Sequence, residues 1–512
     1  MSAVALGEAS TVGGLLLRSA RRWPDSPALV EEQTGLTHRQ AAERARTAAR
    51  RLAARGVRPG DRVALALPNG WRYAVAYYAV QLAGATAVLV NTRFAPPETE
   101  HVLGDSGACA TVVDADTAAR VPQLCPHWDV DELTGPGAEA DDLPGLAAVS
   151  TAVANILYTS GTTGRPKGAM QTHGNLLVNA GTVGSVMAVT ESDRTLVVAP
   201  MFHATGIASQ LVGFGAHGAA CVFLPRFRPA DMLGALIGHR ITFFAGVTAM
   251  IQLMLADPGF DPHDLTALRT ACFGGAPVAE AFLDEAARRL PHVTLMNVWG
   301  LTEATSIVTC TAGPQWLKRP WSAGRPVPGV EVAVAVDGRI ADPPDPDAVG
   351  ELWVRGPVVT AGYWNRPDTG IFRPDGWLRT GDVGRADADG YVQVLDRLND
   401  MIIRGGENIY SLEVESVLAR HPAITEVAVV GVPDPVMGER VRAVAVLGPG
   451  RSLTLGALRE WAGTQLADYK LPAELVTVTA LPRNASGKVI KKQLAGQPAA
   501  GSARTPSTTA RT

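Results

Sequence analysis

The sequence predicts an α/β protein, with a large N-terminal domain of helix-covered parallel sheets plus a β-rich subdomain, and a small mobile α+β C-terminal domain. Helix-like and strand-like segments alternate early in the chain and again from Asp193 to Thr294, which is typical of parallel sheets covered by helices. After about Gly324, short strands separated by Gly, Pro and Asp dominate, and an α+β pattern returns from Asp400. The length of 512 residues also exceeds what one hydrophobic core usually organises.

The first alternation lies between residues 39 and 91. The segment from Arg39 to Ala54 is rich in strong helix formers, and Gly56 follows as a stop signal. The apolar run from Asp61 to Asn69 predicts a buried strand that ends in a turn. A helix is then expected around Trp71 to Ala83, followed by a strand over Ala85 to Asn91.

A second, smaller domain is expected near the C-terminus. Helices are predicted over Leu412 to Ala419 and Leu455 to Leu466, with strands over Glu426 to Val432 and Arg442 to Gly448 between them. The last residues contain too few apolar side chains to pack against a core. The predicted order is a large domain over 1–396, a hinge over 397–400, a small domain over 401–495 and a disordered tail over 496–512.

Composition excludes several classes of protein. A net charge of −3 leaves no basic footprint for nucleic acid or an anionic membrane. The five cysteines are odd in number and lack CxxC or metal-ligand spacing, which argues against a disulfide framework. The N-terminus lacks a signal pattern, and the most apolar window, Ile207 to Leu224, is interrupted by Gln210 and His217. We therefore expect a cytoplasmic protein without membrane insertion or a nucleic-acid partner.

The segment "YTSGTTGRPKGAM", Tyr158 to Met170, is rich in glycine and hydroxyl residues. Such residues let the backbone approach a ligand and supply N–H and O–H donors, and Lys167 adds a positive charge. These features indicate a phosphate-binding loop, and the apolar "ANIL" before it predicts a strand that leads into the loop. It is not the common P-loop, because no Gly-Lys-Ser/Thr follows at the required spacing. From composition alone, a flexible surface loop is the alternative.

The ordered text of this loop resembles the signature loop of the adenylate-forming superfamily, which includes acyl- and aryl-CoA synthetases, peptide-synthetase adenylation domains and firefly luciferase. Other segments follow in the family's order: "PMFHATG", "FGGAP", "VWGLTE", "AGRPVPGVEV", "GYWNRPD", "WLRTGD", "DRLNDMIIRGGENIYSLEVE" and "PRNASGKVIKK". The resemblance covers roughly Gly56 to Lys492, nearly the whole chain. On these motifs the chain is identified as a member of the superfamily, most similar to the acyl- or aryl-CoA ligases.

The resemblance implies a two-step reaction with ATP, Mg²⁺ and CoA. A carboxylic acid would be activated to an acyl-adenylate with release of pyrophosphate, and the acyl group would then pass to the thiol of CoA. An alternative keeps the adenylation of an acid (or of nitrite) but transfers the product to a carrier-protein thiol or an amine in a biosynthetic pathway. A catalytically inactive nucleotide-binding or scaffold protein is a third interpretation. It is disfavoured by the joint presence of Lys167, Glu303, Asp382, Arg397 and Lys488.

The resemblance also implies an ATP site. Both reactants are anions, so the site must neutralise charge and hold the two in line. Trp299 stands where the family usually has a tyrosine, and its larger ring can still stack on adenine. Asp382 and Arg397 match the residues near the ribose hydroxyls. The implied ATP-binding residues are Thr159, Ser160, Gly161, Thr162, Thr163, Gly164, Lys167, Gly274, Gly275, Ala276, Pro277, Trp299, Gly300, Asp382 and Arg397.

Four residues are implied in catalysis. Glu303 in "LTE" resembles the family's magnesium-binding carboxylate, and Thr302 beside it is expected to touch the α-phosphate. Lys488 in "SGKV" resembles the mobile lysine of the small domain, whose ammonium would reach both the substrate carboxylate and the α-phosphate. His203 matches a residue between the acyl pocket and the thiol route, and a hydrogen-bonded core histidine is its alternative interpretation.

Further positions follow from the same resemblance. It implies a hinge at Asn399, where the family typically has Asp or Lys, and a CoA contact at Gly405 and Gly406. Thr248 also departs from the family, which frequently has proline there, so the acid is expected to be unusual. The implied acid pocket consists of Phe202, His203, Gly206, Ile207, Val247 and Met250. Its apolar character fits a medium-chain or an aromatic acid. The expected partners are this small-molecule acid and, for the alternative reaction, a carrier protein in trans, with the chain a monomer or homodimer.

Overall fold

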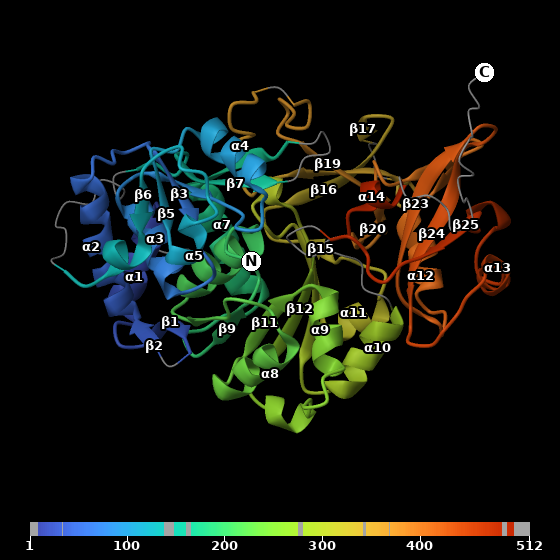
Figure 1. Cartoon of the computed structure of the whole chain (residues 1–512), viewed down its shortest axis with the longest axis horizontal. Coiled ribbons are helices and arrows are strands. Elements are labelled where there is room, and N and C mark those ends of the chain that lie inside the picture. Colours follow the sequence, from blue (N-terminus) through green and yellow to red (C-terminus); the bar gives the residue numbers. More distant parts are fainter. Residues whose placement is uncertain are drawn as a thin grey trace, which may run out of the picture. The chain divides into compact units, whose positions relative to one another are not determined.

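The computed structural model describes residues 9–32, 34–137, 148–159, 165–274, 280–340, 345–367, 369–483 and 489–495 (Figure 1). The chain divides into two compact units. The first comprises Met1–Ala348, Leu352–Thr380 and Ala386–Gln393, and the second comprises Val349–Glu351, Gly381–Arg385 and Val394–Thr512. The predicted α/β class is confirmed by parallel sheets with helices and by a separate C-terminal α+β part. The predicted domain limits themselves stay predictions.

A six-stranded sheet in the first unit has the order β6-β5-β3-β4-β7-β8. Only its edge strand β8 runs antiparallel to its neighbour, whereas the other pairs are parallel. Central strands such as β4 are buried at every residue, which explains their continuous apolar sequence. The strands are β3 (Arg62–Ala66), β4 (Thr86–Leu89), β5 (Ala110–Val113), β6 (His127–Asp129), β7 (Val153–Thr159) and β8 (Lys167–Thr172).

A nine-stranded sheet has the order β15-β14-β13-β12-β11-β9-β10-β1-β2. Its interior pairs are parallel, and antiparallel strands β2, β14 and β15 complete its two edges. The strands are β1 (Pro27–Glu31), β2 (Thr34–Thr37), β9 (Arg194–Val197), β10 (Ala220–Phe223), β11 (Phe243–Gly246), β12 (Thr270–Gly274), β13 (Thr294–Trp299), β14 (Thr309–Ala312) and β15 (Arg325–Pro326).

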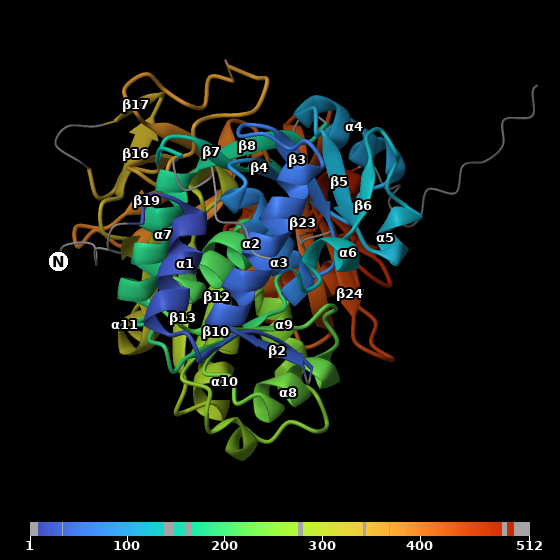
Figure 2. The same cartoon turned by 90° about the vertical axis from the view of Figure 1, so that its left-hand side faces the viewer.

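Helices of the first unit form the layers over these sheets. Helices α1, α2, α3 and α7 pack together (Figure 2), and α8, α9, α10 and α11 gather beside the nine-stranded sheet (Figure 1). The helices are α1 (Val12–Arg22), α2 (His38–Ala54), α3 (Trp71–Leu82), α4 (Pro96–Ser106), α5 (Ala115–Ala118), α6 (Val130–Thr134), α7 (His173–Val186), α8 (Pro229–Gly238), α9 (Thr248–Leu255), α10 (Glu280–Arg289) and α11 (Gly313–Lys318). Three further helical segments are the π-helix η2 (Thr205–Phe214) and the 3₁₀ turns η3 (Pro262–Leu265) and η4 (Thr302–Ala304).

The remaining strands form two smaller sheets. One has the order β17-β16-β18-β19-β20, with β16 (Glu331–Val336), β17 (Arg339–Ile340), β18 (Gly350–Arg355), β19 (Leu378–Ala386) and β20 (Val392–Arg397). The other has the order β22-β21-β24-β23, with β25 paired to β24. Its strands and helices are β21 (Ile402–Arg404), β22 (Glu407–Ile409), β23 (Ile424–Asp434), β24 (Gly438–Leu447), β25 (Glu474–Thr477), α12 (Ser411–Leu418), α13 (Leu455–Gly463), η5 (Asp468–Lys470) and α14 (Lys491–Ala495).

The predicted elements exist, and their ends differ by a few residues. Helix α2 begins one residue early because Thr37 and Gln40 form a capping box before it. The strand expected from Asp61 covers only Arg62–Ala66, since Pro68 and the following residues turn into α3. The apolar window from Ile207 is a buried helix and strand, as expected. Within the described ranges, no helix is both long and apolar enough to cross a membrane.

His173 joins the starts of two helices in the first unit. The backbone N–H of Val12 donates to His173 Nδ1 at 3.3 Å, which ties α1 to α7. Burial lowers the pKa of His173 to about 4. The hydrogen bond agrees with that direction, because a protonated Nδ1 could not accept it.

We expect His173→Asn to lose less stability in acid than the parent. Between about pH 6.5 and pH 4 the unfolded chain binds a proton at His173 that the folded chain does not, so stability falls as pH falls through this window. An asparagine oxygen can accept the Val12 bond without titrating. Chemical denaturation at pH 7.5 and pH 4.5 should show a loss smaller by about 2 kcal/mol in the variant. If the free energy of unfolding falls equally in both proteins, His173 is not the group that makes the fold sensitive to acid.

Candidate active site

Two antiparallel strands carry the predicted phosphate loop. Strand β7 ends at Thr159 and β8 begins at Lys167, and these two residues pair across the strands. The strand that "ANIL" predicts is therefore present. Gly168 has no room for a side chain, because an added Cβ would lie 2.6 Å from Ile156 Cγ2. The loop residues Ser160, Gly161, Thr162, Thr163 and Gly164 lie outside the described residues.

A distant segment pairs with β8 and brings a tyrosine to Lys167. The N–H of Met170 donates to the carbonyl of Gly362 at 2.9 Å, and the N–H of Trp364 donates to the carbonyl of Gly168 at 2.8 Å. The intervening Tyr363 thereby lies beside the first residue of β8, and its ring centroid is 5.6 Å from Lys167 Nζ. Lys167 is thus held near a ring face, an arrangement that favours a cation.

Glu303 lies on the short helix η4, next to Thr302. Its Oε1 accepts a hydrogen bond from the Tyr363 hydroxyl at 2.6 Å and one from Thr159 Oγ1 at 3.4 Å. Its backbone carbonyl accepts from the N–H of Thr360 at 2.9 Å. Two hydrogen bonds therefore fix the carboxylate and a third fixes its backbone, and the carboxylate lies next to the end of β7 where the phosphate loop begins.

This arrangement fits a magnesium ion bound together with a nucleotide. The described part of the chain contains no cluster of three or more His, Cys, Asp or Glu that could hold a metal. Mg²⁺ is commonly held by one or two carboxylates together with substrate phosphates and waters. A single fixed carboxylate at Glu303, beside the start of the phosphate loop, satisfies that requirement.

The predicted adenine residues lie at the ends of two adjacent strands. Gly274 ends β12 and Trp299 ends β13, and Gly274 pairs with Val298 in parallel register. Nucleotides commonly bind at the carboxyl ends of strands in such sheets. An added Cβ on Gly300 would lie 1.6 Å from the Ser306 carbonyl oxygen, so only glycine fits there. Gly275, Ala276 and Pro277 lie outside the described residues.

The predicted acid pocket is divided between two hydrophobic clusters. Phe202 and Ile207 pack in the cluster that contains α3 and η2, whereas Met250 packs against the cluster of α8 and α9. Val247 is the residue before α9. At Gly206, an added Cβ would lie 2.5 Å from the Pro200 carbonyl oxygen, so the start of η2 approaches the preceding backbone closely.

His203 is a neutral histidine at physiological pH. Burial, with a smaller contribution from the charge of Arg93, lowers its pKa to about 4. Its ring centroid is 4.9 Å from that of Phe202. Its Nε2 is buried and has no hydrogen-bond partner among the described residues. The alternative of a hydrogen-bonded core histidine is therefore not supported at this nitrogen.

In the second unit, the predicted ribose residues form an ion pair. Asp382 is buried in β19, and its Oδ1 lies 2.6 Å from Nε of Arg397 at the end of β20. Asn399 follows in an exposed turn that is closed by a hydrogen bond from the N–H of Asp400 to the Arg397 carbonyl at 3.0 Å. The predicted hinge is thus a compact turn directly after the ion pair.

A buried polar cluster spans this turn. Asp396 Oδ2 accepts from both the backbone N–H and the hydroxyl of Ser411, the latter at 2.7 Å. Lys491 Nζ donates to Ser411 Oγ at 2.6 Å and lies 2.7 Å from Glu415 Oε1. The cluster joins the residue before the turn to the segment that follows Lys488. Lys488 itself lies outside the described residues.

Gly405 and Gly406 form the tip of the hairpin between β21 and β22. Their φ angles are +60° and +90°, and Arg404 pairs with Glu407 on either side of them. A two-residue hairpin with both φ angles positive is a turn that strongly prefers glycine. Both glycines are therefore required by the fold, and a contact with CoA remains a prediction.

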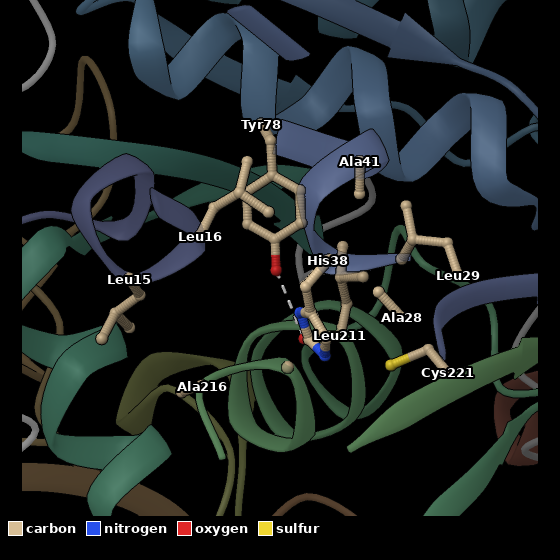
Figure 3. Close-up of a pocket in the computed structure, with 11 residues that line it drawn as sticks. Leu15, Leu16, Ala28, Leu29, His38, Ala41, Tyr78, Leu211, Ala216 and Cys221 are labelled. Carbon is tan, nitrogen blue, oxygen red and sulfur yellow. Dashed lines mark hydrogen bonds between the residues drawn. The ribbon is translucent and has the colours of Figure 1, made fainter. Parts of the chain in front are cut away.

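The small cavity in Figure 3 is not a substrate site. It measures about 10 Å³ and lies between α1, α2, α3 and η2. The hydroxyl of Tyr78 donates to the carbonyl of Leu211 at 3.4 Å. His38 Nε2 lies 3.0 Å from the Gly218 carbonyl oxygen. A cavity of that size holds about one water molecule at most.

Comparison with known proteins identifies the family. A family model described as AMP-binding enzyme matches residues 16–364, and one described as AMP-binding enzyme C-terminal domain matches residues 413–488. The chain belongs to this family, the adenylate-forming enzymes, as its motifs indicated.

The relatives specify the reaction. The chain is similar to a feruloyl-CoA synthase of Amycolatopsis sp, with 38% identity over 94% of this chain and 98% of the relative. A long-chain-fatty-acid–CoA ligase of Mycobacterium tuberculosis is 34% identical over 95% of this chain and 98% of its own length. The o-succinylbenzoate CoA synthetase of Bacillus subtilis, solved with an acyl-adenylate, has a TM-score of 0.85 at 33% identity, over 95% of this chain and 98% of that chain. This protein is an AMP-forming acid:CoA ligase that uses ATP, Mg²⁺ and CoA.

Several residues with a structural role at the site were missed by the sequence analysis. Tyr363 stands in "GYWNRPD", a segment that supported the resemblance but received no role. Arg93 received no role, and Asp396 was used only as the limit of the large domain, because the residues next to them in the fold, His203 and Ser411, are distant in the sequence. Gln171, whose side-chain amide donates to the Thr305 carbonyl, was also missed.

We expect Asp382→Ala to weaken ATP binding more than turnover. Loss of this carboxylate removes the predicted ribose acceptor, and ribose contacts are present in both the ground and transition states. The KM for ATP should rise by about 10-fold or more, with kcat within a few-fold of the parent. Glu331→Ala, which removes the exposed partner of Arg355, is the matched control. A fall in kcat with an unaltered KM for ATP would contradict the ribose assignment.

Proposed function

We propose that this ligase activates an aromatic acid that carries a polar ring substituent, such as a hydroxylated cinnamate. The observation that supports this most is the buried Nε2 of His203, which lacks a partner among the described residues. Leaving such a group unsatisfied costs about 1–3 kcal/mol, so a polar group of the substrate would offset that cost. The ring of Phe202, at 4.9 Å, supplies an apolar face beside it. The 38% identity to a feruloyl-CoA synthase supports the same class of acid.

The neutral state of His203 favours an uncharged polar substituent on the ring of the acid. With a pKa of about 4, the imidazole carries no charge at neutral pH and acts as a hydrogen-bond partner. A phenol or methoxy oxygen suits a neutral ring nitrogen better than a second carboxylate does. The positive charge of Arg93 contributes to the lowered pKa of His203, and the Arg93 side chain is exposed to solvent.

The roles of the nucleotide residues are part of the same proposal. Glu303 would hold Mg²⁺, which would neutralise phosphate charge, and Thr302 would contact the α-phosphate. Lys167 and the loop from Thr159 to Gly164 would bind the β- and γ-phosphates. Trp299, Gly300 and the segment Gly274 to Pro277 would enclose adenine, and Asp382 with Arg397 would bind ribose. The hydrogen bonds that Glu303 accepts from Tyr363 and Thr159 support its role in holding Mg²⁺.

We also propose that the small domain turns about Asn399 between the two half-reactions. Lys488 would serve adenylation, and the Gly405–Gly406 turn would serve thiolysis. The exposed turn at Asn399 supports a hinge there. The limits 1–396, 397–400 and 401–495 for the large domain, hinge and small domain belong to this proposal.

The proposal also covers the cellular compartment and the oligomeric state of the protein. The five cysteines are all unpaired in the structure, which suits a cytoplasmic protein. We propose a monomer or homodimer that takes a small acid and CoA without a nucleic-acid partner. A carrier protein in trans would be a second acceptor. Size-exclusion chromatography with light scattering would distinguish the monomer from the homodimer.

We expect a hydroxycinnamate to be the best substrate in a panel that includes unsubstituted cinnamate, octanoate and 2-succinylbenzoate. The assay is pyrophosphate release, repeated with CoA to detect the thioester. His203→Phe should lower the preference for hydroxycinnamate over cinnamate by about 10-fold, because the substituent loses its partner. The KM for the acid should show no inflection near pH 6.5. A preference for octanoate, or an unaltered ratio in His203→Phe, would contradict the proposed acid.

We expect Lys488→Ala to slow adenylation by about 100-fold or more, comparable to the loss of one charge-stabilising donor. Thiolysis of a supplied acyl-adenylate should remain close to the parent rate. Asn399→Pro should do the reverse, since a fixed φ at the hinge obstructs rotation. Single-turnover measurements of both steps provide the test. Equal slowing of the two steps by Lys488→Ala would be incompatible with alternating domain positions.

A further inference from the structure

We propose that Gln171 is a positioning residue that orients the carboxylate of Glu303 through a strained turn at Thr305. The proposal rests on the proposed role of Glu303 as the magnesium-binding carboxylate. Gln171 lies on β8 and Thr305 lies two residues after Glu303, so the two belong to different elements. Backbone angles and hydrogen bonds within the first unit support this role.

The backbone at Thr305 adopts a rare conformation. Its φ is +65° and its ψ is −46°. The N–H of Ser306 donates to the carbonyl of Ala304 at 2.7 Å across it. These angles and this hydrogen bond define the γ-turn that is rare and strained for L-residues. A β-branched residue at positive φ adds to the strain, so surrounding contacts must hold the turn in place.

Three hydrogen bonds hold Thr305, which is fully buried. Its N–H donates to the carbonyl of Thr302 at 3.0 Å, and its Oγ1 donates to the carbonyl of Val358 at 2.6 Å. Its own carbonyl accepts from Nε2 of Gln171 at 3.1 Å. Gln171 is the one of these three partners that lies on the strand carrying Lys167.

The amide of Gln171 is itself fixed by a chain of buried amides. Nδ2 of Asn155 donates to Oε1 of Gln171 at 3.2 Å, and Nε2 of Gln81 lies 3.4 Å from Oδ1 of Asn155. All three side chains have no exposed surface. Because the oxygen of Gln171 accepts from Asn155, its NH₂ group faces the Thr305 carbonyl. The three linked amides therefore hold a hydrogen-bond donor against the Thr305 carbonyl in the strained turn.

The contacts around Ser306 leave the turn little freedom. The carbonyl oxygen of Ser306 approaches Gly300 so closely that a Cβ there would lie 1.6 Å from it. The hydroxyl of Ser209 donates to the hydroxyl of Ser306 at 2.7 Å. If the Gln171 bond is lost, the turn can relax toward negative φ, and the helical turn that carries Glu303 must move with it. The carboxylate would then lie away from the end of the phosphate loop.

The test uses ATP binding without any acid, so that no reaction occurs. Calorimetric titrations of ATP at a series of Mg²⁺ concentrations give the concentration at which Mg²⁺ has half its effect on ATP affinity. We expect Gln171→Leu to raise that concentration by about 10-fold, while ATP affinity in EDTA changes less than about 2-fold. His38→Leu also removes a buried side chain bonded to a carbonyl and should leave the Mg²⁺ dependence unaltered.

A double-mutant cycle tests the metal-binding role of Glu303 separately from the positioning role of Gln171. Glu303→Gln alone should raise the required Mg²⁺ concentration, and Gln171→Leu should add less than about 2-fold in that background, because the carboxylate it positions is gone. If Glu303→Gln leaves the Mg²⁺ dependence unaltered, the proposed role of Glu303 fails. If Glu303→Gln shifts it but Gln171→Leu does not, the positioning inference is overturned while the role of Glu303 stands.

A second variant covers the case in which Gln171→Leu does not fold. Thr305→Val keeps the shape of the side chain and removes the bond from Oγ1 to the Val358 carbonyl. It loosens the same turn from its other side, so its Mg²⁺ requirement should rise in the same direction as that of Gln171→Leu. A folded Thr305→Val with the parent's Mg²⁺ dependence would contradict the inference, because the turn would then have no influence on Glu303.

Discussion

The hydrogen bond from the Tyr363 hydroxyl to Glu303 is the contact around which the described nucleotide residues are arranged. At 2.6 Å, it joins a segment paired with β8 to the short helix after β13. The same oxygen accepts from Thr159 at the end of β7, so one carboxylate connects the six-stranded sheet with the segment that follows β13 of the nine-stranded sheet. A charged acceptor makes such bonds stronger than neutral ones. Fixing the carboxylate in advance reduces the rearrangement needed when a polyanion binds.

Glycines make this arrangement possible by allowing backbones to approach closely. Gly168 packs under Ile156 and Tyr158, and Gly300 packs against the Ser306 carbonyl. The glycines of the family motifs are therefore explained partly by packing, before any ligand contact is considered. Gly405 and Gly406 are a different case, since their positive φ angles are set by the hairpin. A motif glycine thus does not by itself identify a ligand contact.

Sequence patterns predicted the elements and the family well but predicted few of the contacts at the site. The alternation of apolar segments determines strands such as β3 and helices such as α2, because their faces must be buried locally. The strained turn at Thr305 has no comparable local signal. Its conformation depends on Gln171, which lies far away in the sequence. Likewise, the low pKa of His203 results from burial, which a single motif does not reveal.

A crystal structure of the protein with ATP and Mg²⁺ tests these roles of Glu303 and Thr305 most directly. We expect the Glu303 carboxylate on the metal, with the Tyr363 hydroxyl still donating to it. We also expect Thr305 at positive φ, with its carbonyl bonded to Gln171. A metal bound without Glu303, or a Thr305 that has relaxed to negative φ while Glu303 keeps its place on the metal, would contradict these roles.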